Sequence, residues 1–326
     1  MPDTVELLER LIGFDTTSRN SNLDLLAWVE GLLEQHGVAS RRIPNEDGSK
    51  ANLVARIGPD VAGGVVLCGH TDTVPVDGQP WDTDPHTLIE KDGRLYGRGT
   101  ADMKGFIACA LAAVPTLVAA ELRRPITLAF TYDEEVGCVG APSLAADLVD
   151  NEPRPAVVIT GEPTSMRVVR AHKGIRVSRT TVTGLDGHSS QGQPTASAII
   201  GAGRIIAHIG DLADELRESG VRAEGFHPPH TTANVGTVEG GQAVNIVPRH
   251  CAFTWEFRPV PGEDADAIAD AVRTYARDEI LPRLRASAPG ADVTFEVIAD
   301  VPALDAAGNA EAAALVAGLA GADEGP

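Results

Sequence analysis

The stretch Val65-Val66-Leu67-Cys68-Gly69-His70-Thr71-Asp72-Thr73-Val74-Pro75 decides the fold of this chain. Its first residues are mostly apolar and predict a buried strand that Gly69 closes. His70 stands where that strand ends, which is the edge where open α/β sheets carry their chemistry. Asp72 lies two residues further, so on an extended chain its side chain points to the same side as His70. A carboxylate there would fix the imidazole tautomer and leave the other ring nitrogen free for a metal, although a His in a polar turn is the simpler alternative.

The composition is that of a globular protein without a nucleic-acid or membrane partner. With 326 residues the chain can hold two domains, and its net charge of −19 argues against nucleic acid and anionic membranes. No apolar signal segment precedes the first helical pattern, and no apolar run is long enough to span a membrane, so we expect a cytoplasmic protein. The four widely spaced cysteines predict buried free thiols in a reducing compartment. They are Cys68, Cys109, Cys138 and Cys251.

Acidic residues follow two further predicted strands. The strand Pro125–Tyr132 runs into Asp133-Glu134-Glu135, and the strand Ala156–Thr160 is followed by Glu162. Burying three acids is costly unless a cation pairs with them, although a solvated loop would also explain the run. If the strands are parallel, their acidic ends lie on the same edge of one sheet as the end of the His70 strand.

A glycine-rich stretch supplies one more acid. In Gly97-Arg98-Gly99-Thr100-Ala101-Asp102-Met103-Lys104-Gly105, the residue Asp102 comes at the start of the predicted helix Phe106–Val118 and after a hairpin turned at Asp92-Gly93. The alternative role for such an Asp is a helix N-cap. One imidazole and several carboxylates on one edge predict a site for Zn²⁺ or Co²⁺, and four or five ligands with a shared carboxylate would suit two metals about 3.5 Å apart.

The second half of the chain has a different pattern, which predicts a compact inserted domain. The expected elements are a strand at Ile175–Thr183, a helix at Pro194–Arg217, a hairpin of Thr231–Val238 and Ala243–Arg258, a helix at Ala265–Ile280 and a strand at Val293–Ile298. The order βαββαβ is that of a ferredoxin-like split βαβ fold. We therefore expect an inserted α+β domain over 175–300. Residues 1–174 and 301–326 would form an α/β catalytic domain with a central, mostly parallel sheet flanked by helices.

Five motifs in this order resemble the dinuclear-zinc amidohydrolases and peptidases, a family that includes acetylornithine deacetylase, succinyl-diaminopimelate desuccinylase and glutamate carboxypeptidase. The motifs are Gly69-His70-Thr71-Asp72-Thr73-Val74-Pro75, the Gly97–Gly105 stretch, Asp133-Glu134-Glu135, Gly161-Glu162-Pro163-Thr164 and Gly187-His188-Ser189-Ser190. The sequence Val76-Asp77-Gly78-Gln79-Pro80-Trp81 is most similar to the acetylornithine deacetylase branch. The resemblance implies a zinc-peptidase-like catalytic domain, and an inserted domain that serves as lid and dimerisation surface.

The resemblance also implies roles for the residues at the sheet edge. His70 would bind one zinc with Asp72 behind it, and Asp102 would bridge two Zn²⁺ or Co²⁺ ions. Glu162 would complete the first metal position, and Glu135 would bind the second. Glu134 would act as the general base, its carboxylate pointing away from that of Glu135.

Residues of the inserted domain receive roles from the same resemblance. His188 would reach the site of a partner subunit and stabilise the oxyanion, which implies a homodimer. Arg258 would bind the α-carboxylate of an N-acyl amino acid, and Asn234 is a weaker candidate for that pocket. The alternatives are a polar turn for His188 and a surface position for Arg258, while Trp255 and Phe257 would be core residues.

One departure from the family pattern bears on the expected activity. The family has a further metal-binding His after the inserted domain, whereas the last His here is His250, within 175–300. The resemblance is thus to a shortened relative, which would be truncated, completed by a partner or non-catalytic. The expected reaction is hydrolysis of N2-acetyl-L-ornithine in arginine biosynthesis, with succinyl-diaminopimelate, a carboxypeptidase substrate or another N-acyl amino acid as the alternative.

Overall fold

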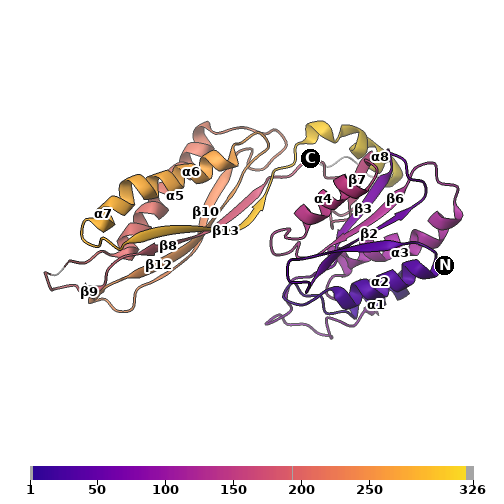
Figure 1. Ribbon diagram of the computed structural model, residues 1–326, viewed down its shortest axis with the longest axis horizontal. Coiled ribbons are helices and arrows are strands. Elements are labelled where there is room, and N and C mark those ends of the chain that lie inside the picture. The colour runs from indigo at the N-terminus through magenta and orange to yellow at the C-terminus, as the bar shows by residue number, and fades with distance from the viewer. Residues whose placement is uncertain (1–2, 193, 321–326) are drawn as a thin grey trace. The chain divides into compact units, whose positions relative to one another are not determined.

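The computed structural model describes residues 3–192 and 194–320, which form two compact units (Figure 1). The first unit holds the described residues up to Val168 and those from Ala314 onward. The second unit runs from Val169 to Ala313.

A five-stranded sheet with the order β1-β2-β6-β3-β7 forms the centre of the first unit. Its strands are β1 (Ser40–Pro44), β2 (Ala51–Ile57), β3 (Val65–His70), β6 (Ile126–Thr131) and β7 (Val157–Thr160). Strands β6, β3 and β7 are parallel, while β1 and β2 join antiparallel at one side. The carboxyl ends of β3, β6 and β7 therefore lie at one edge, and the predicted α/β fold is confirmed.

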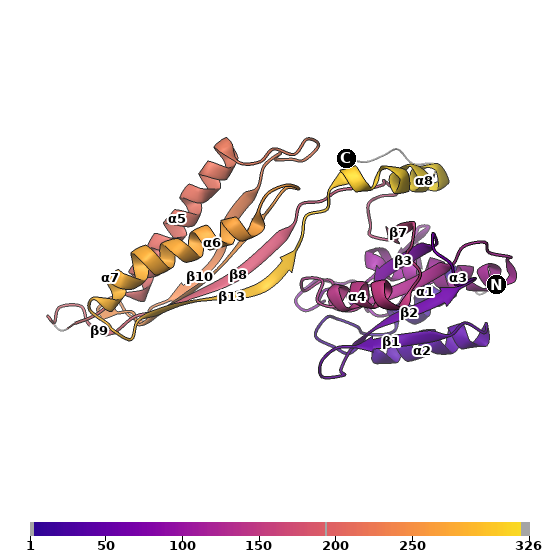
Figure 2. The same cartoon turned by 45° about the horizontal axis from the view of Figure 1, so that its top comes forward.

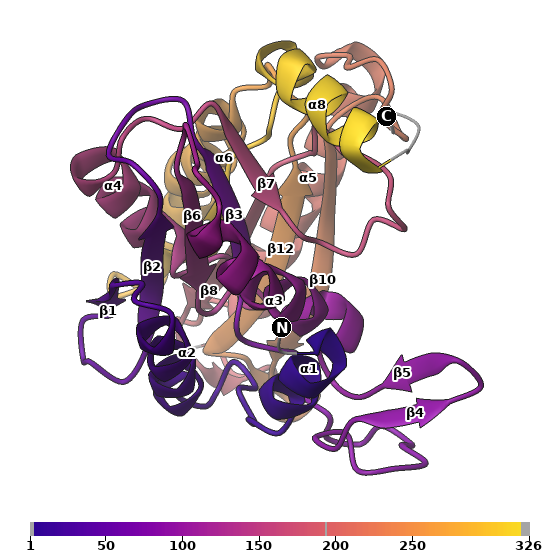
Figure 3. The same cartoon turned by 90° about the vertical axis from the view of Figure 1, so that its right-hand side faces the viewer.

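Helices cover both faces of this sheet (Figure 3). They are α1 (Thr4–Ile12), α2 (Leu23–Gln35), α3 (Gly105–Ala119) and α4 (Ala141–Asn151). One face packs against α1, α2 and α3 through a core that includes Leu11, Ile107 and Phe130, all fully buried. The other face packs against α4, where Leu144 contacts a smaller cluster with Val66. Both faces are thus apolar, as the continuous apolar runs of β3 and β6 predict.

The stretch Thr100–Ala119, which includes α3, is long and apolar enough to cross a membrane by length and composition alone. The expectation that no apolar run reaches this length is therefore wrong. In the structure Ile107, Leu111 and Val114 of this stretch are fully buried in the core shared with α1 and the sheet. Its packing is that of a core helix.

The second unit is a four-stranded antiparallel sheet covered on one face by helices (Figure 2). Its strands are β8 (Ile175–Thr183), β10 (Thr232–Gly240), β12 (His250–Arg258) and β13 (Asp292–Val301), and its helices are α5 (Ala198–Ser219), α6 (Ala265–Tyr275) and α7 (Leu281–Arg285). The spatial order β10-β12-β8-β13 confirms the predicted βαββαβ pattern. Phe253, Trp255 and Phe257 point into the core beneath the helices.

The second predicted hairpin strand is wrong over its first residues. Residues 243–249 do not continue β12; instead β11 (Ile246–Val247) pairs antiparallel with β9 (Gly187–His188). Pro248 explains the interruption, because it has no N–H to donate to a strand ladder. Two helix limits also differ from the prediction. Helix α5 begins at Ala198, because the Ser197 side chain accepts a hydrogen bond from the N–H of Ile200 and caps the helix. The helix predicted to end at Ile280 runs on into α7.

Several short elements complete the described chain. They are the hairpin β4 (Ile89–Lys91) and β5 (Arg94–Tyr96), the π-helical turns Thr100–Lys104 and Ala276–Ile280, the turn Ala306–Gly308 and α8 (Ala310–Ala320). The β4–β5 hairpin forms its own small sheet, so Asp102 reaches the edge of the central sheet from a loop and not from a strand end. All four cysteines are free, but only Cys251 is buried and Cys109 is exposed, which corrects the prediction of four buried thiols.

Candidate metal centre

The ends of three parallel strands and one loop bring five metal-ligand side chains together. His70 is the last residue of β3, the acids Glu134 and Glu135 follow β6, and Glu162 follows β7. Two groups of the described residues have ligand atoms within 4.8 Å of one another. One is His70, Glu134 and Glu135, and the other is His70, Asp102 and Glu162. His70 belongs to both groups.

His70 is 1% exposed and its ring nitrogens face different partners. Nδ1 lies 2.9 Å from the backbone carbonyl oxygen of Asp72 and 3.5 Å from its carboxylate. The carbonyl is therefore the closer acceptor for an Nδ1–H, and the Asp72 carboxylate, predicted to fix the tautomer, lies beside it. Nε2 lies 3.0 Å from an oxygen of Asp102. It also lies 3.9 Å from oxygens of both Glu134 and Glu162, so this nitrogen faces the acids.

The Asp72 carboxylate ties the loop after β3 to the loop after β6. It accepts hydrogen bonds from the Ser18 hydroxyl at 2.7 Å and from the backbone N–H groups of Glu134 and Glu135 at 3.1 and 3.3 Å. Burial would raise the pKa of Asp72, but its contacts with His70, Ser18 and Glu134 outweigh burial and lower it. Asp72 thus stays ionised and orients the backbone of two acids of the cluster.

Glu134 and Glu135 both bring a carboxylate oxygen to the His70 ring. The expectation that neighbouring side chains here point different ways is therefore wrong for these two residues. The left-handed conformation of Asp133, with φ 54°, turns the chain directly before them. The Cys138 thiol donates to the other Glu134 oxygen at 3.6 Å, so the two acids differ in their further contacts.

Asp102 lies in a non-helical part of the turn Thr100–Lys104, with φ −122° and ψ 94°, and its peptide bond to Met103 is cis. Helix α3 begins only at Gly105 with Lys104 as its N-cap residue, so the N-cap alternative for Asp102 is wrong. Lys104 is 1% exposed and donates to the carbonyl oxygens of Leu11 and Phe14 at 3.0 and 2.8 Å. The turn that carries Asp102 is thereby attached to the chain at the C-terminal end of α1.

The electrostatics of the cluster favour a bound cation. Burial alone would lower the pKa of His70, but the hydrogen bond and charge of Asp72 and the charges of Glu162 and Glu134 raise it to about 10. Burial raises the pKa of Glu162 to about 7, the charge of His70 opposes this, and the charges of Glu134 and Asp102 add to it. One imidazole and four carboxylates form a donor set that suits Zn²⁺ and Co²⁺, and the crowding of like charges is what a divalent ion would relieve.

The second unit carries the other three predicted site residues. His188 lies on the short strand β9, where Nδ1 of its ring is 2.9 Å from the Ser190 hydroxyl and accepts from the Ser190 backbone N–H at 3.3 Å. Arg258 ends β12 and donates to Glu256 at 2.9 Å. Asn234 on β10 lies opposite Glu256 in the register, so Asn234, Glu256 and Arg258 share one face of the sheet.

Comparisons with known proteins identify the family of this chain. The sequence profile of the peptidase family M20/M25/M40 matches residues 66–318. The chain belongs to the M20 family. An acetylornithine deacetylase from Myxococcus xanthus is 40% identical over 284 residues, which cover 85% of this chain and 72% of that protein. One from Proteus mirabilis is 36% identical over 298 residues, which cover 89% and 74% of the two chains. As a member of this family, the chain is a metallo-amidohydrolase.

Solved structures share the fold. An M20 family metallo-carboxypeptidase from Sulfolobus solfataricus superposes with a TM-score of 0.76 at 17% identity, covering 99% of this chain and 85% of that one. An aminopeptidase from Bacillus cereus gives a TM-score of 0.71 at 22% identity, covering 98% and 82%. The fold is thus shared among chains whose sequences differ widely.

Three residues around the His70 cluster were not predicted from the sequence: Ser18, Lys50 and Cys138. The only sequence signal for Lys50 is the expected cost of three buried acids, which calls for a nearby cation. Ser18 and Cys138 carry no such signal, because a Ser in a polar loop and a Cys in an apolar run are ordinary.

The raised pKa values predict how metal affinity depends on pH. Without metal, His70 and much of Glu162 hold a proton at neutral pH, and both must lose it to bind a metal. Zn²⁺ affinity should therefore rise with pH through the pKa of Glu162 at about 7 and on toward the pKa of His70 at about 10, with release of protons. Calorimetric titration in buffers of different ionisation enthalpy measures the protons released. A pH-independent affinity would contradict these protonation states.

The glycine before Glu162 allows close packing against α3. A Cβ at Gly161 would lie 1.9 Å from the Phe106 ring, so Gly161→Ala forces one of them to move. We expect a loss of unfolding free energy of about 1–3 kcal/mol, the usual cost of overpacking. Denaturant unfolding measures it. Gly31→Ala in α2 is the control, because its Cβ meets nothing within 4 Å and should stabilise the helix by up to about 1 kcal/mol.

Proposed function

We propose that this chain hydrolyses the acetyl amide of N2-acetyl-L-ornithine to L-ornithine and acetate. The observation that carries the proposal is the His70 cluster, in a chain up to 40% identical to proteins named acetylornithine deacetylase. Arginine biosynthesis in the cytoplasm is the corresponding proposed setting.

The proposed cofactor is a pair of divalent ions, Zn²⁺ or Co²⁺. His70 and Glu162 would hold one ion, Glu135 the other, and Asp102 both. The two groups of ligand atoms share His70, which supports two adjoining positions. Bound there, the metals would activate a water and polarise the amide carbonyl.

Glu134 is the proposed general base. Its carboxylate lies 3.9 Å from the His70 ring nitrogen that faces the cluster, so it is beside the place where the water would react. The carboxylate takes a proton from the attacking water and later gives it to the leaving amine. The Cys138 thiol, on the other Glu134 oxygen, helps to hold the side chain in this orientation.

His188 is the proposed oxyanion donor. Its Nδ1 accepts from the Ser190 backbone N–H, so the proton of the neutral ring is on Nε2. An Nε2–H is the group needed to stabilise the charge that develops on the amide oxygen.

Arg258 is the proposed partner of the substrate α-carboxylate, with Asn234 beside it. The Arg258–Glu256 pair is partly exposed, at 45% and 33% for the two side chains. The substrate carboxylate can therefore take the place of the Glu256 carboxylate on Arg258 at little cost in free energy. A guanidinium binds a carboxylate through two parallel N–H donors.

A homodimer in which His188 serves the partner's centre follows from this proposal, and subunit mixing tests it. His188→Ala alone should lower kcat by about 10²–10³-fold, as removal of an oxyanion donor does. Mixing it with Glu134→Gln subunits should restore partial activity, because some hybrid sites then hold both intact residues. His250→Ala, at an exposed position of the same unit, is the control. Failure of mixed, exchanging subunits to gain activity would exclude action across a dimer.

A substrate panel tests the reaction itself. The Zn²⁺- or Co²⁺-loaded chain is given N2-acetyl-L-ornithine, N-succinyl-diaminopimelate and other N-acyl amino acids, and kcat/KM is compared by amine release. The highest value for acetylornithine supports the proposal. A higher kcat/KM for another N-acyl amino acid would make that compound the substrate. If a folded, metal-loaded chain turned over none of these compounds, the proposed function would be overturned.

A further inference from the structure

We propose that Lys50 is a positioning residue for the metal centre: it holds the loop that carries Glu134 and Glu135 in the geometry that binds metal. The inference deepens the proposed function and rests on it, because it takes Glu135 as a ligand. The Lys50 ammonium bonds to Asp133 and to Ser18, neither of which belongs to the two ligand groups, so it acts on the ligands through Asp133.

Lys50 lies at the junction of two loops. It precedes β2, and its ammonium donates to both oxygens of Asp133 at 2.6 and 2.7 Å and to the backbone carbonyl of Ser18. The side chains of Lys50 and Asp133 are only 13% and 14% exposed. An ion pair this sheltered from water is screened much less than a surface pair, and both of its carboxylate oxygens are used.

The backbone at Asp133 needs such a restraint. Its φ of 54° is left-handed, a conformation uncommon for residues with a Cβ, although Asp adopts it more readily than most. The chain then folds back, with the N–H of Val139 bound to the Asp133 carbonyl at 2.9 Å. Lys50 anchors the side chain of the residue at which this turn begins.

The orientation of Asp133 is passed on to the ligands through backbone donors. Glu134 and Glu135 follow immediately, and their N–H groups point to the Asp72 carboxylate. Ser18, whose carbonyl accepts from Lys50, donates its hydroxyl to the same carboxylate at 2.7 Å. Lys50 thus braces both segments that meet at Asp72, and Asp72 in turn lies behind His70. Loss of the ammonium frees the two segments at once.

Lys50 also supplies positive charge beside the carboxylates of the cluster. Among the lysine and arginine ion pairs of the described residues, Lys50–Asp133 is the one that involves the acidic run after β6. Without it Asp133 would be a sheltered, unpaired carboxylate next to Glu134 and Glu135. A sheltered carboxylate without a partner is costly, so the side chain moves toward solvent and the turn is displaced.

The test uses Co²⁺, whose visible absorption reports the number and geometry of its ligands. The full chain carrying Lys50→Met is titrated with Co²⁺ and compared with the unaltered chain. We expect a changed absorption spectrum and Co²⁺ affinity lowered by about 10–100-fold, the usual effect of losing a residue behind the ligands. With acetylornithine, kcat should fall while KM stays within about twofold. Lys50→Arg should retain most of the affinity, because its guanidinium can still pair with Asp133.

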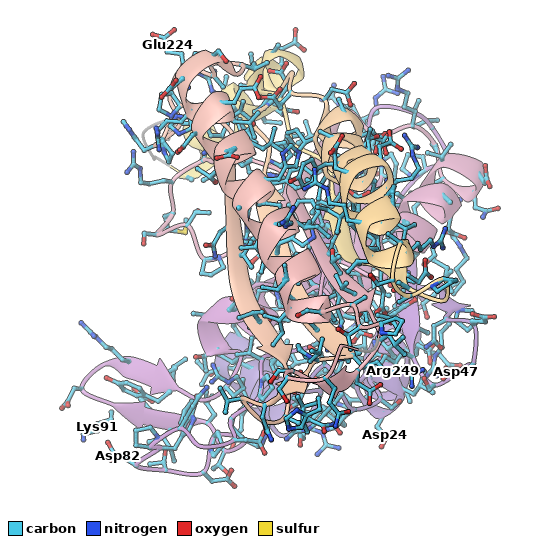
Figure 4. The ribbon with its side chains drawn as sticks, turned by 90° about the vertical axis from the view of Figure 1, so that its left-hand side faces the viewer. Asp24, Asp47, Asp82, Lys91, Glu224 and Arg249 are labelled. Carbon is cyan, nitrogen blue, oxygen red and sulfur yellow. The ribbon has the colours of Figure 1, made fainter. Side chains whose placement is uncertain are left out.

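Lys91→Met is the matched control, because Lys91 is an exposed lysine on the β4–β5 hairpin, away from the sheet (Figure 4). It should leave spectrum and affinity unchanged. Should Lys50→Met fail to fold, Asp133→Asn decides, since it removes the charge of the pair and keeps a hydrogen-bond acceptor. An unchanged spectrum and affinity in the folded variants overturns the proposal. Co²⁺ binding without turnover of any amide by the unaltered chain would instead refute the proposed function, while the spectral comparison still decides the role of Lys50.

Discussion

Replacement of Glu134 by glutamine is expected to lower kcat by about 10²–10⁴-fold, the range over which a positioned general base contributes. Glutamine keeps the shape of the side chain and can still accept from the Cys138 thiol, which lies 3.6 Å from the Glu134 carboxylate. It cannot take a proton from water at neutral pH. Fold, KM and metal content should therefore remain close to those of the unaltered chain.

The measurement is kcat and KM for acetylornithine together with metal content after dialysis. Glu46→Gln makes the same change at an exposed turn and is the control. Glu135→Gln gives the contrast: as a ligand rather than a base, its loss should lower metal content as well as kcat. If Glu134→Gln lost metal and Glu135→Gln kept it, the two roles would be reversed. This comparison is critical because both carboxylates lie beside His70.

The sequence predicts the parts of this site that follow directly from strand ends. His70 and Glu162 stand at the ends of short apolar runs, and parallel pairing of β3 with β7 places those ends together. The acids after β6 follow the same rule. In the second unit the alternation of Ile175–Thr183 predicts β8 with its limits, because one face packs on helices and the other does not.

The rest depends on contacts between residues far apart in the chain. Lys50 meets Asp133 across 83 residues, and Ser18 meets Asp72 across 54. No local periodicity encodes either pair, since each is set by the order of strands in the sheet and by loop conformations. The sequence does not predict the pairing of β9 with β11 either, because two residues on each strand give no pattern. Pro248 alone indicates that β12 starts late.

Local backbone geometry is the other source of error. The sequence places Asp102 at a helix start, where an N-cap is the ordinary role. The structure delays the helix to Gly105, and the buried Lys104 anchors the intervening turn. Burial of a lysine among carbonyl groups cannot be predicted from composition, because lysines are rarely buried.

Replacement of His70 by alanine is expected to abolish metal binding at the position that His70 would form with Glu162 and Asp102. The imidazole belongs to both groups of possible ligands, and its Nε2 lies 3.0 Å from Asp102 and 3.9 Å from Glu162. Its loss should lower affinity by more than the roughly 10–100-fold expected for a residue behind the ligands, and activity should fall with it. Calorimetric titration with Zn²⁺ counts the sites that remain, and His250→Ala is the control.

The same substitution should destabilise the metal-free protein in a pH-dependent way. The pKa of His70 is raised from 6.5 to about 10, so the folded state binds its proton more tightly than the unfolded state. That stabilisation is complete below the unfolded pKa and is lost as pH rises through the folded one. The unfolding midpoints of His70→Ala and the unaltered metal-free chain should thus differ most near neutral and lower pH, and converge toward about pH 10. Equal differences at every pH would mean that His70 is neutral in the metal-free state, and that the acids around it are balanced by protons rather than by the imidazolium.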